Sequence, residues 1–232
     1  LAFFGTILYA IGFVGNLVVP KTIDGEPQTS LAAAVLINAS LLLLFALQHS
    51  IMARPAFKRW WTRMIPKELE RSSFVLLSSL CLMLLMWQWQ PVGGIVWSVE
   101  SKTAKDLLFI FYLAGWGIVF ISTFLINHFD LFGLRQVWLY FNGNPYTELP
   151  FRLPGLYQLV RHPLYLGFLI AFWSTPVMTV AHLLFALLTT GYILTAIRFE
   201  ERDLITHFGE KYQSYKKWAP MLIPFSKRKA TK

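Results

Sequence analysis

Six runs of apolar residues alternate with polar segments along the chain. They cover residues 2–19, 31–52, 72–90, 107–126, 164–180 and 183–197. Because a helix needs about 20 apolar residues to cross the hydrocarbon core of a bilayer, the first four runs are long enough to span it. The last two runs are shorter, and the brief connection between them predicts a tight helical hairpin. The pattern therefore predicts an all-α integral membrane protein with five to six transmembrane helices.

The composition agrees with this interpretation. Hydrophobic residues make up 56% of the 232 positions and charged residues only 14%. A soluble domain of this size could not bury so much apolar surface. The single cysteine, Cys81, excludes an internal disulfide and a cysteine-based metal centre, and no metal site is expected. The chain begins with a leucine, so we expect residues before it in the natural protein.

The chain has a net charge of +9, and its basic residues gather in particular connections of the predicted topology. Of the 21 Lys and Arg residues, only Lys21, Lys102 and Lys105 fall in the two other connections; the rest lie at 54–71, 135–161 and 198–232. Six spans place those three groups on one side, which the positive-inside rule identifies as the cytoplasm. We therefore expect a multi-pass protein of the bacterial inner membrane whose basic residues contact anionic membrane lipid, with no nucleic acid partner and no obligate protein partner.

The chain is interpreted as one domain, 1–232, in three parts. Residues 1–126 hold four transmembrane helices, and residues 127–160 form a cytoplasmic loop, rich in proline and aromatic residues, that could act as a lid. Residues 161–224 hold the hairpin and a tail. After the hairpin, the helix is expected to continue into the cytosol, break at Gly209 and resume as a short aromatic and basic helix.

Polar residues gather where the predicted hairpin opens toward the cytoplasm. Antiparallel arms joined by a brief connection should bring residues 161–165 and 198–202 to the same depth. Those segments contain Arg161, His162 and Tyr165 on one arm, and Arg198, Glu200 and Glu201 on the other. Two adjacent carboxylates at a membrane border need a cationic partner or a ligand that carries positive charge. The pattern therefore indicates a binding site at this end.

Three ordered motifs in the last third of the chain carry a family resemblance. They are "RHPLYLG" at 161–167, the pair Glu200-Glu201, and "FGEKYQSY" at 208–215 followed by Pro220. This arrangement resembles the membrane methyltransferases of the isoprenylcysteine carboxyl and phospholipid N-methyltransferase group, over about 155–224. Two earlier strings, "QHSIMARPAFKRWWTRMIPKELERS" and "INHFDLFGLRQVW", resemble the NnrU-related bacterial branch, and within it the methanethiol S-methyltransferases.

The resemblance implies a cofactor and roles for particular residues. S-adenosyl-L-methionine would bind at the cytoplasmic end of the last two helices, where His162 and Tyr165 hold it from one arm and the Glu pair meets its ribose or ammonium group. Arg198 would pair with the cofactor carboxylate or steady the Glu pair. Gly167 would permit close approach of the cofactor or of a neighbouring helix. The implied reaction is S-methylation of methanethiol, a small thiol, to dimethyl sulfide.

The thiol acceptor sets a further requirement. A free thiol is mostly protonated at neutral pH, whereas the thiolate is the nucleophile, so the site needs a base or a positive field. The candidates at the cytoplasmic level are His128, His49 and Arg161. A histidine near a helix end is also often an interface or packing residue, so both functions are open for the two histidines.

Other activities are compatible with the same residues. A related enzyme could methylate a prenylcysteine carboxylate or a lipid amine at the same cofactor site. A membrane reductase would need basic residues around the 2′-phosphate of NADPH, and Lys216 and Lys217 leave that open. A haem-binding or accessory membrane protein would need two histidines facing each other within the bilayer, and the five histidines here are scattered along the chain.

Overall fold

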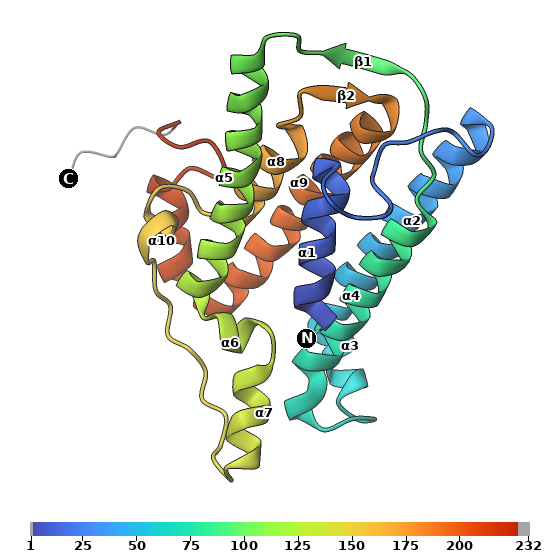
Figure 1. Cartoon of the computed structure of the whole chain (residues 1–232). Helices are drawn as coiled ribbons and strands as arrows, with labels where there is room; N and C mark the ends of the chain where they lie inside the picture. The colour runs from blue at the N-terminus through green and yellow to red at the C-terminus, as the bar shows by residue number, and fades with distance from the viewer. Residues whose placement is uncertain (1, 227–232) are drawn as a thin grey trace.

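The computed structural model describes residues 2–226, and the chain is almost entirely helical (Figure 1). Within this described range, four helices are long and apolar enough to cross a membrane. They are α2 (Leu31–Met52), α4 (Glu70–Gln88, with the 3-10 turn η1, Lys67–Leu69, before it), α5 (Lys102–Ile126) and α9 (Val180–Phe208). Two shorter apolar helices accompany them, α1 (Ala2–Gly15) and α8 (Pro163–Trp173). The prediction of an all-α membrane protein is confirmed.

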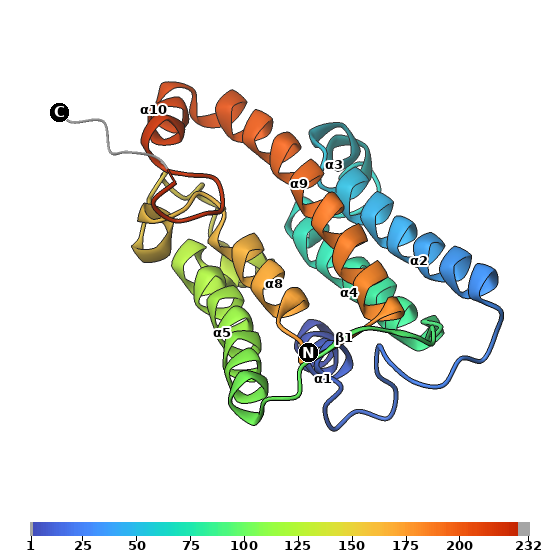
Figure 2. The same ribbon diagram turned by 90° about the horizontal axis from the view of Figure 1, so that it is seen from above.

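The helices form two packed pairs with α9 between them. Seen from above, α5 and α8 lie together on one side, α2 and α4 lie on the other, and α9 crosses diagonally between the pairs (Figure 2). Helix α1 packs against α4. The main core forms where these helices meet, around Phe13, Trp89, Tyr112, Phe172 and Phe185. Helical pairs of this kind bury their inner faces and leave the outer apolar side chains for lipid.

The two ends of the bundle differ in composition. One end carries the end of α2, the start of α4 and the end of α5, and we call it the basic end because Arg54, Arg71, Arg135 and Arg161 lie there. The opposite end carries a small antiparallel sheet of β1 (Ile95–Ser98) and β2 (Val177–Thr179). The hydrophobic pattern did not predict this sheet, because both strands are too short to show an alternating pattern.

The last two apolar helices differ in length from the predicted hairpin arms. Helix α8 has 11 residues and ends at Trp173, since Pro176 follows within three residues and cannot continue a helix. Helix α9 has 29 residues and continues through its charged segment to Phe208. It ends at Gly209, whose φ of 56° suits glycine, and α10 (Glu210–Trp218) follows. The predicted continuation and break at Gly209 are confirmed, whereas two arms of similar length are not found.

Two other helix boundaries also differ from the apolar runs. Helix α1 has 14 residues rather than the run 2–19, because Asn16 takes a left-handed conformation (φ 53°) that ends it. Helix α5 begins at Lys102, five residues before the run 107–126, because its first turn is polar. Ser101 caps that turn by accepting a hydrogen bond from the backbone N–H of Ala104. Apolar runs therefore locate the helices but misplace their polar first and last turns.

Short helices at the basic end interrupt the connecting segments. The amphipathic stretch after α2 forms α3 (Pro55–Trp61). In the segment 127–160, predicted as a loop, the structure has α6 (His128–Leu131), α7 (Leu134–Phe141) and the 3-10 turn η2 (Gly155–Gln158). Residues 144–154 have no regular structure. None of these helices is long enough to cross a bilayer, which agrees with a connecting segment.

Candidate active site

The start of α8 and the last turns of α9 meet at the basic end, together with the chain that follows α10. Pro163 is the first residue of α8, a position where proline costs no hydrogen bond. The backbone N–H groups of Arg161 and His162 donate to the carbonyl oxygens of Pro220 at 2.9 Å and Met221 at 3.2 Å. The segment after α10 therefore lies along the approach to α8 and closes this part of the site.

Glu201 on α9 is the centre of the polar cluster. Its Oε1 accepts a hydrogen bond from Nε of Arg161 at 2.7 Å and lies 3.2 Å from Nε2 of His162. Its Oε2 lies 2.6 Å from Nζ of Lys216 on α10. The residue is only 6% exposed, so these partners replace the hydration that the carboxylate loses. The expected meeting of segments 161–165 and 198–202 is thus present, and both oxygens of Glu201 are occupied by protein groups.

The neighbouring Glu200 has a different environment. Its Oε2 is buried and has no hydrogen-bond partner among residues 2–226, and Nδ1 of His162 lies 3.8 Å from it. The hydroxyl of Tyr165 faces the same carboxylate. On α10, the hydroxyl of Tyr212 is also buried without a partner in the described chain. Because buried polar atoms are nearly always hydrogen-bonded, these two oxygens mark a place for a polar ligand or water.

Burial also sets the protonation state of the α10 tyrosines. Loss of hydration raises the pKa of Tyr212, and the nearby Glu201 raises it further. Loss of hydration also raises the pKa of Tyr215, and the Tyr215 hydroxyl donates to the carbonyl of Tyr157 at 2.6 Å. Both side chains are therefore neutral hydroxyl donors at physiological pH. Tyr215 fixes α10 to the segment before α8, while Tyr212 keeps its donor available.

Gly167 allows close contact between two helices. A Cβ at this position would lie 2.6 Å from the carbonyl oxygen of Gly115 and 2.8 Å from the backbone nitrogen of Val119, both on α5. Gly115 faces Gly167 in the same way, because its own Cβ would lie 2.7 Å from the Gly167 carbonyl. Of the two roles expected for Gly167, the structure shows approach of a neighbouring helix, since α5 occupies the space where a side chain would be.

Arg198 lies two residues before the Glu pair on α9. Its side chain is exposed and forms no ion pair with any described residue. Arg161 and Lys216 are the cations that contact Glu201, and the pairing of Arg198 with the cofactor carboxylate stays a prediction. Its guanidinium group is accessible to a ligand anion. In the same described range, no three His, Cys, Asp or Glu side chains gather as metal ligands.

His128 lies in an aromatic environment at the end of α5. Its ring stacks on Phe124 with centroids 4.3 Å apart, and Nδ1 lies 2.9 Å from the hydroxyl of Thr123. That hydroxyl donates its proton to the carbonyl of Phe120, so Nδ1 of His128 is the donor and Nε2 carries the lone pair. Burial lowers the pKa of His128, which favours the neutral ring.

His49 lies on α2 in a second group of aromatic rings. It stacks with Phe45 at 5.3 Å and lies 4.8 Å from the ring of Phe74, and its Nδ1 is 3.2 Å from the hydroxyl of Ser78. None of the recorded contacts of either histidine, in the described part of the chain, reaches Arg161 or Glu201. Of the three residues expected to act on the thiol, only Arg161 lies in the cluster around Glu201.

Sequence reasoning missed the contribution of α10. Lys216 received no role in a methyltransferase site, and Tyr212 was recognised only as part of a motif. The signal was present, since Tyr212, Tyr215 and Lys216 recur at intervals of three and four residues and so share one helix face. The break at Gly209 directs that face back toward α8. This reversal of direction depends on the left-handed backbone at Gly209, which the spacing alone does not specify.

Comparison with known proteins adds a second kind of evidence. The chain is 56% identical over 97% of its length to the methanethiol S-methyltransferase of Crocosphaera subtropica, covering 88% of that protein. It is 51% identical over 95% of its length to the methanethiol S-methyltransferase of Mycobacterium tuberculosis, covering 90% of it. The chain belongs to this family. The methanethiol S-methyltransferase family was also the one indicated by the sequence motifs, and that prediction is confirmed.

More distant similarity extends to a mammalian protein. Nurim of Mus musculus is 31% identical over 75% of the chain, which covers 70% of Nurim. No family model and no solved structure matches the chain. Membership of the methanethiol S-methyltransferase family implies a methyl donor. The buried polar cluster at the basic end has unsatisfied polar groups on two helices, Glu200 on α9 and Tyr212 on α10.

Proposed function

We propose that this protein transfers a methyl group from S-adenosyl-L-methionine to the sulfur of methanethiol and forms dimethyl sulfide. The observation that carries the proposal is the 56% identity to a methanethiol S-methyltransferase across 97% of the chain. The cluster around Glu201 supports it with a buried polar site between three helices. When bound, S-adenosyl-L-methionine supplies a methyl group activated by the positive charge of its sulfonium.

The residues of the cluster fit the polar groups of this cofactor. The ribose hydroxyls and the ammonium group are donors, and the unpaired Oε2 of Glu200 is an acceptor. The Tyr212 hydroxyl is a neutral donor that suits an acceptor atom of the cofactor. The exposed guanidinium of Arg198 suits the cofactor carboxylate. We assign cofactor binding to Glu200, Tyr212 and Arg198, together with Tyr165 and His162 beside them.

Glu201 acts as a positioning residue in this proposal. Both of its oxygens are engaged by protein groups, Oε1 by Arg161 and His162 and Oε2 by Lys216, so its main contacts are within the protein. It fixes the start of α8 against α9 and α10, and so holds the cofactor-binding side chains in one arrangement. Holding two reactants in a productive orientation can account for a large part of the rate increase in a displacement reaction.

The reaction also releases a proton, because the thiol S–H bond is lost as the new S–CH₃ bond forms. Arg161 keeps its charge and is held by Glu201 and the Ala219 carbonyl, so it contributes positive field. His128 is our first candidate for the proton acceptor, since its Nε2 carries a lone pair. His49 is the second candidate, and its hydrogen bond to Ser78 leaves the other ring nitrogen for this role.

We further propose that the basic end faces the cytoplasm of a bacterial cell. The positive-inside rule places lysine- and arginine-rich connections on that side. The connections at the opposite end carry only Lys21, Lys102 and Lys105. In this orientation a water-soluble cofactor reaches the site from the cytoplasm, while methanethiol and dimethyl sulfide, both small and apolar, can enter and leave through the lipid.

The proposal is tested with purified protein in lipid nanodiscs. We expect incubation with methanethiol and S-adenosyl-L-methionine carrying a labelled methyl group to give labelled dimethyl sulfide, measured by headspace gas chromatography. A matched reaction contains a prenylcysteine analogue in place of methanethiol. Methylation of the analogue without dimethyl sulfide would overturn the acceptor, and no methylation of either would overturn the activity. A visible absorption spectrum of haem, or thiol-independent oxidation of NADPH, would support the other activities considered above.

A further inference from the structure

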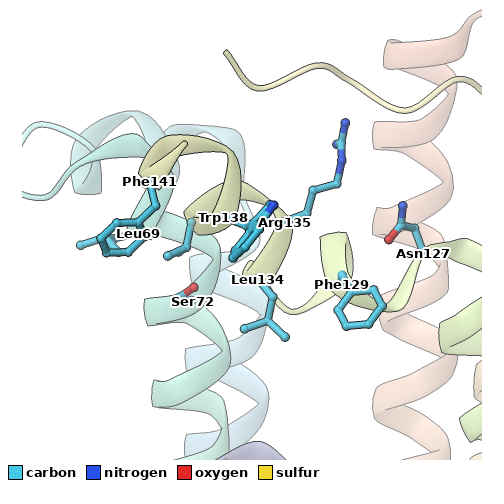
Figure 3. A pocket seen from close by; sticks show the side chains of 9 residues that line it. Leu69, Ser72, Asn127, Phe129, Leu134, Arg135, Trp138 and Phe141 are labelled. Atoms are coloured by element: carbon cyan, nitrogen blue, oxygen red, sulfur yellow. The ribbon is translucent and has the colours of Figure 1, made fainter. Parts of the chain in front are cut away.

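A hollow of about 850 Å³ lies at the basic end, between the start of α4, α6 and α7 (Figure 3). Its walls are almost entirely apolar and include Leu69 before α4, Phe129 of α6, and Leu134 and Trp138 of α7. This volume is within the range of roughly 300–1,000 Å³ of pockets that bind small molecules. None of the residues of the Arg161–Glu201 cluster lines it. The hollow is therefore separate from that cluster, although Asn127 and Phe129, the neighbours of His128, line it.

Helix α7 presents an apolar stripe to this hollow. Leu134, Val137, Trp138 and Phe141 recur at intervals of three and four residues and all line it. Trp138 is 70% exposed and Phe141 79% exposed. Arg135, which also lines the hollow, holds the helix in place, because it pairs with Asp130 of α6 at 2.9 Å. The stripe thus has a defined orientation although the described chain leaves it uncovered.

The position of the hollow corresponds to the edge of the apolar layer of a membrane. Two of the long apolar helices border it at their termini, α4 beginning at Glu70 and α5 ending at Ile126. Exposed apolar side chains along these helices, such as Leu76 and Phe120, make the surface that faces lipid chains. An amphipathic helix with Trp and Phe on one face is typical of a segment lying at the boundary between headgroups and acyl chains.

Exposed positive charge lies on the segment of chain that leads to Leu69, one wall of the hollow. Arg63 and Lys67 are exposed, and neither forms an ion pair with a carboxylate within residues 2–226. The turn η1 that contains Lys67 packs against α7. Glu68 is the acidic residue of this turn, so the cations outnumber the carboxylate. An apolar hollow whose adjoining segment carries exposed cations is complementary to a molecule with an acyl chain and a phosphate group.

We propose that the hollow binds one anionic phospholipid of the surrounding membrane. An acyl chain of this lipid lies against the α7 stripe, and its phosphate lies toward Arg63 and Lys67. The site holds α7 at the membrane boundary. It does not depend on the proposed methyl transfer, because neither the cofactor nor the thiol takes part in it.

Photo-crosslinking in nanodiscs tests the acyl-chain contact. The nanodiscs contain phosphatidylglycerol and phosphatidylcholine, with a phosphatidylglycerol probe that carries a photoactivatable acyl chain. We expect adducts on Leu134, Trp138 and Phe141 by mass spectrometry, and Trp138→Ala should lower labelling of α7 about tenfold through lost contact area. Trp87→Ala is the matched control, since Trp87 is also 70% exposed but lies at the other end of α4. In the Trp87→Ala variant, the probe should label α7 as strongly as it does in the unaltered protein.

The headgroup contact is tested separately. Replacing the probe by its phosphatidylcholine counterpart should lower α7 labelling several-fold, and Arg63→Ala with Lys67→Ala should remove this preference. Lys102→Ala with Lys105→Ala, at the opposite end, should leave it intact. Equal labelling by both probes, labelling no stronger than on other lipid-facing residues, or crosslinks between the α7 helices of two copies would each overturn the proposal. Unchanged melting curves establish that the variants are folded.

Discussion

The Nε atom of Arg161 lies 2.7 Å from Oε1 of Glu201, although 40 positions separate the two residues in the sequence. Both side chains are almost fully buried, at 5% and 8% exposed. The same guanidinium donates to the carbonyl of Ala219 at 2.5 Å. One arginine therefore joins the start of α8, the end of α9 and the chain after α10. Removing one partner of such a pair is costly, because the other charge stays buried and unpaired.

Glu201→Gln is expected to destabilise the protein. The neutral amide cannot compensate the buried charge of Arg161, so the free energy of unfolding should fall by about 3–5 kcal/mol. Denaturation in detergent, followed by circular dichroism, measures the change. Glu100→Gln is the control, since Glu100 is exposed at the opposite end and should change stability by about 0.5 kcal/mol or less. Equal stability of the two variants would contradict the structural role assigned to Glu201.

Lys216→Ala is expected to loosen the chain that closes the site. Lys216 contacts Oε2 of Glu201, whereas Lys217 next to it is exposed and makes a matched control. Because the Lys216 side chain is 41% exposed, the loss of stability should be about 1 kcal/mol or less. Hydrogen exchange should nevertheless speed up several-fold at the backbone N–H groups of Arg161 and His162, which donate to residues 220 and 221. The same exchange rates in Lys216→Ala and Lys217→Ala would argue against this contact.

Gly167→Ala is expected to separate α5 from α8. The added methyl group would lie 2.6 Å from the Gly115 carbonyl oxygen, a backbone atom that cannot rotate away. Overpacking of this kind costs about 1–3 kcal/mol of stability. Gly117→Ala, on helix α5, is the control. No atom lies within 4 Å of its new Cβ, so this variant should stabilise the helix by about 0.5–1 kcal/mol. Melting curves that move in the same direction for both variants would show that the helices adjust freely.

Glu200→Gln and Tyr212→Phe are expected to weaken cofactor binding without unfolding the protein. Each changes an oxygen that accepts or donates no hydrogen bond within residues 2–226, and the amide introduced by Glu200→Gln can still contact Tyr165, so little stability is lost. Loss of one hydrogen bond to a charged or polar ligand should raise the dissociation constant about tenfold, measured by isothermal titration calorimetry. Glu148→Gln, at an exposed position, is the control. Normal affinity in Glu200→Gln would exclude that carboxylate from the cofactor site.

His128 is expected to make stability depend on pH. Burial lowers its pKa in the folded state, so the unfolded chain binds a proton at a higher pH than the folded protein does. The stability that neutral His128 contributes to the folded protein is complete above the ordinary histidine pKa of about 6.5 and is lost as the pH falls below it. Melting temperatures between pH 8 and pH 5 measure this loss, which should be smaller in His128→Gln. An identical pH profile in the variant would place the titrating group elsewhere.

The sequence predicts the class of the fold well and the details of its ends less well. Apolar runs locate the helices because a bilayer requires a fixed length of apolar side chains. They cannot show that Ser101 caps a polar first turn of α5, or that α9 continues through charged residues to Phe208. Those boundaries depend on hydrogen bonds and helix propensity, to which an apolar count is insensitive.

The candidate site shows a similar division. The meeting of Arg161 with Glu201 follows from two antiparallel helices joined by a short connection, which the sequence indicates. The sequence does not show which of Glu200 and Glu201 contacts Arg161. Adjacent positions on a helix point in directions about 100° apart, and the neighbours that decide between them belong to α8 and α10. Gly167 is the clearest limit of sequence reasoning, because a glycine that admits a ligand and one that admits α5 look identical in a sequence.

The hydrogen bonds from Arg161 and His162 to Pro220 and Met221 have a consequence for biosynthesis. Both acceptors follow α9, so the ribosome makes them after every long helix of the described chain. A nascent chain halted ahead of Pro220 would therefore contain all of these helices but lack the two carbonyl groups that hold the approach to α8.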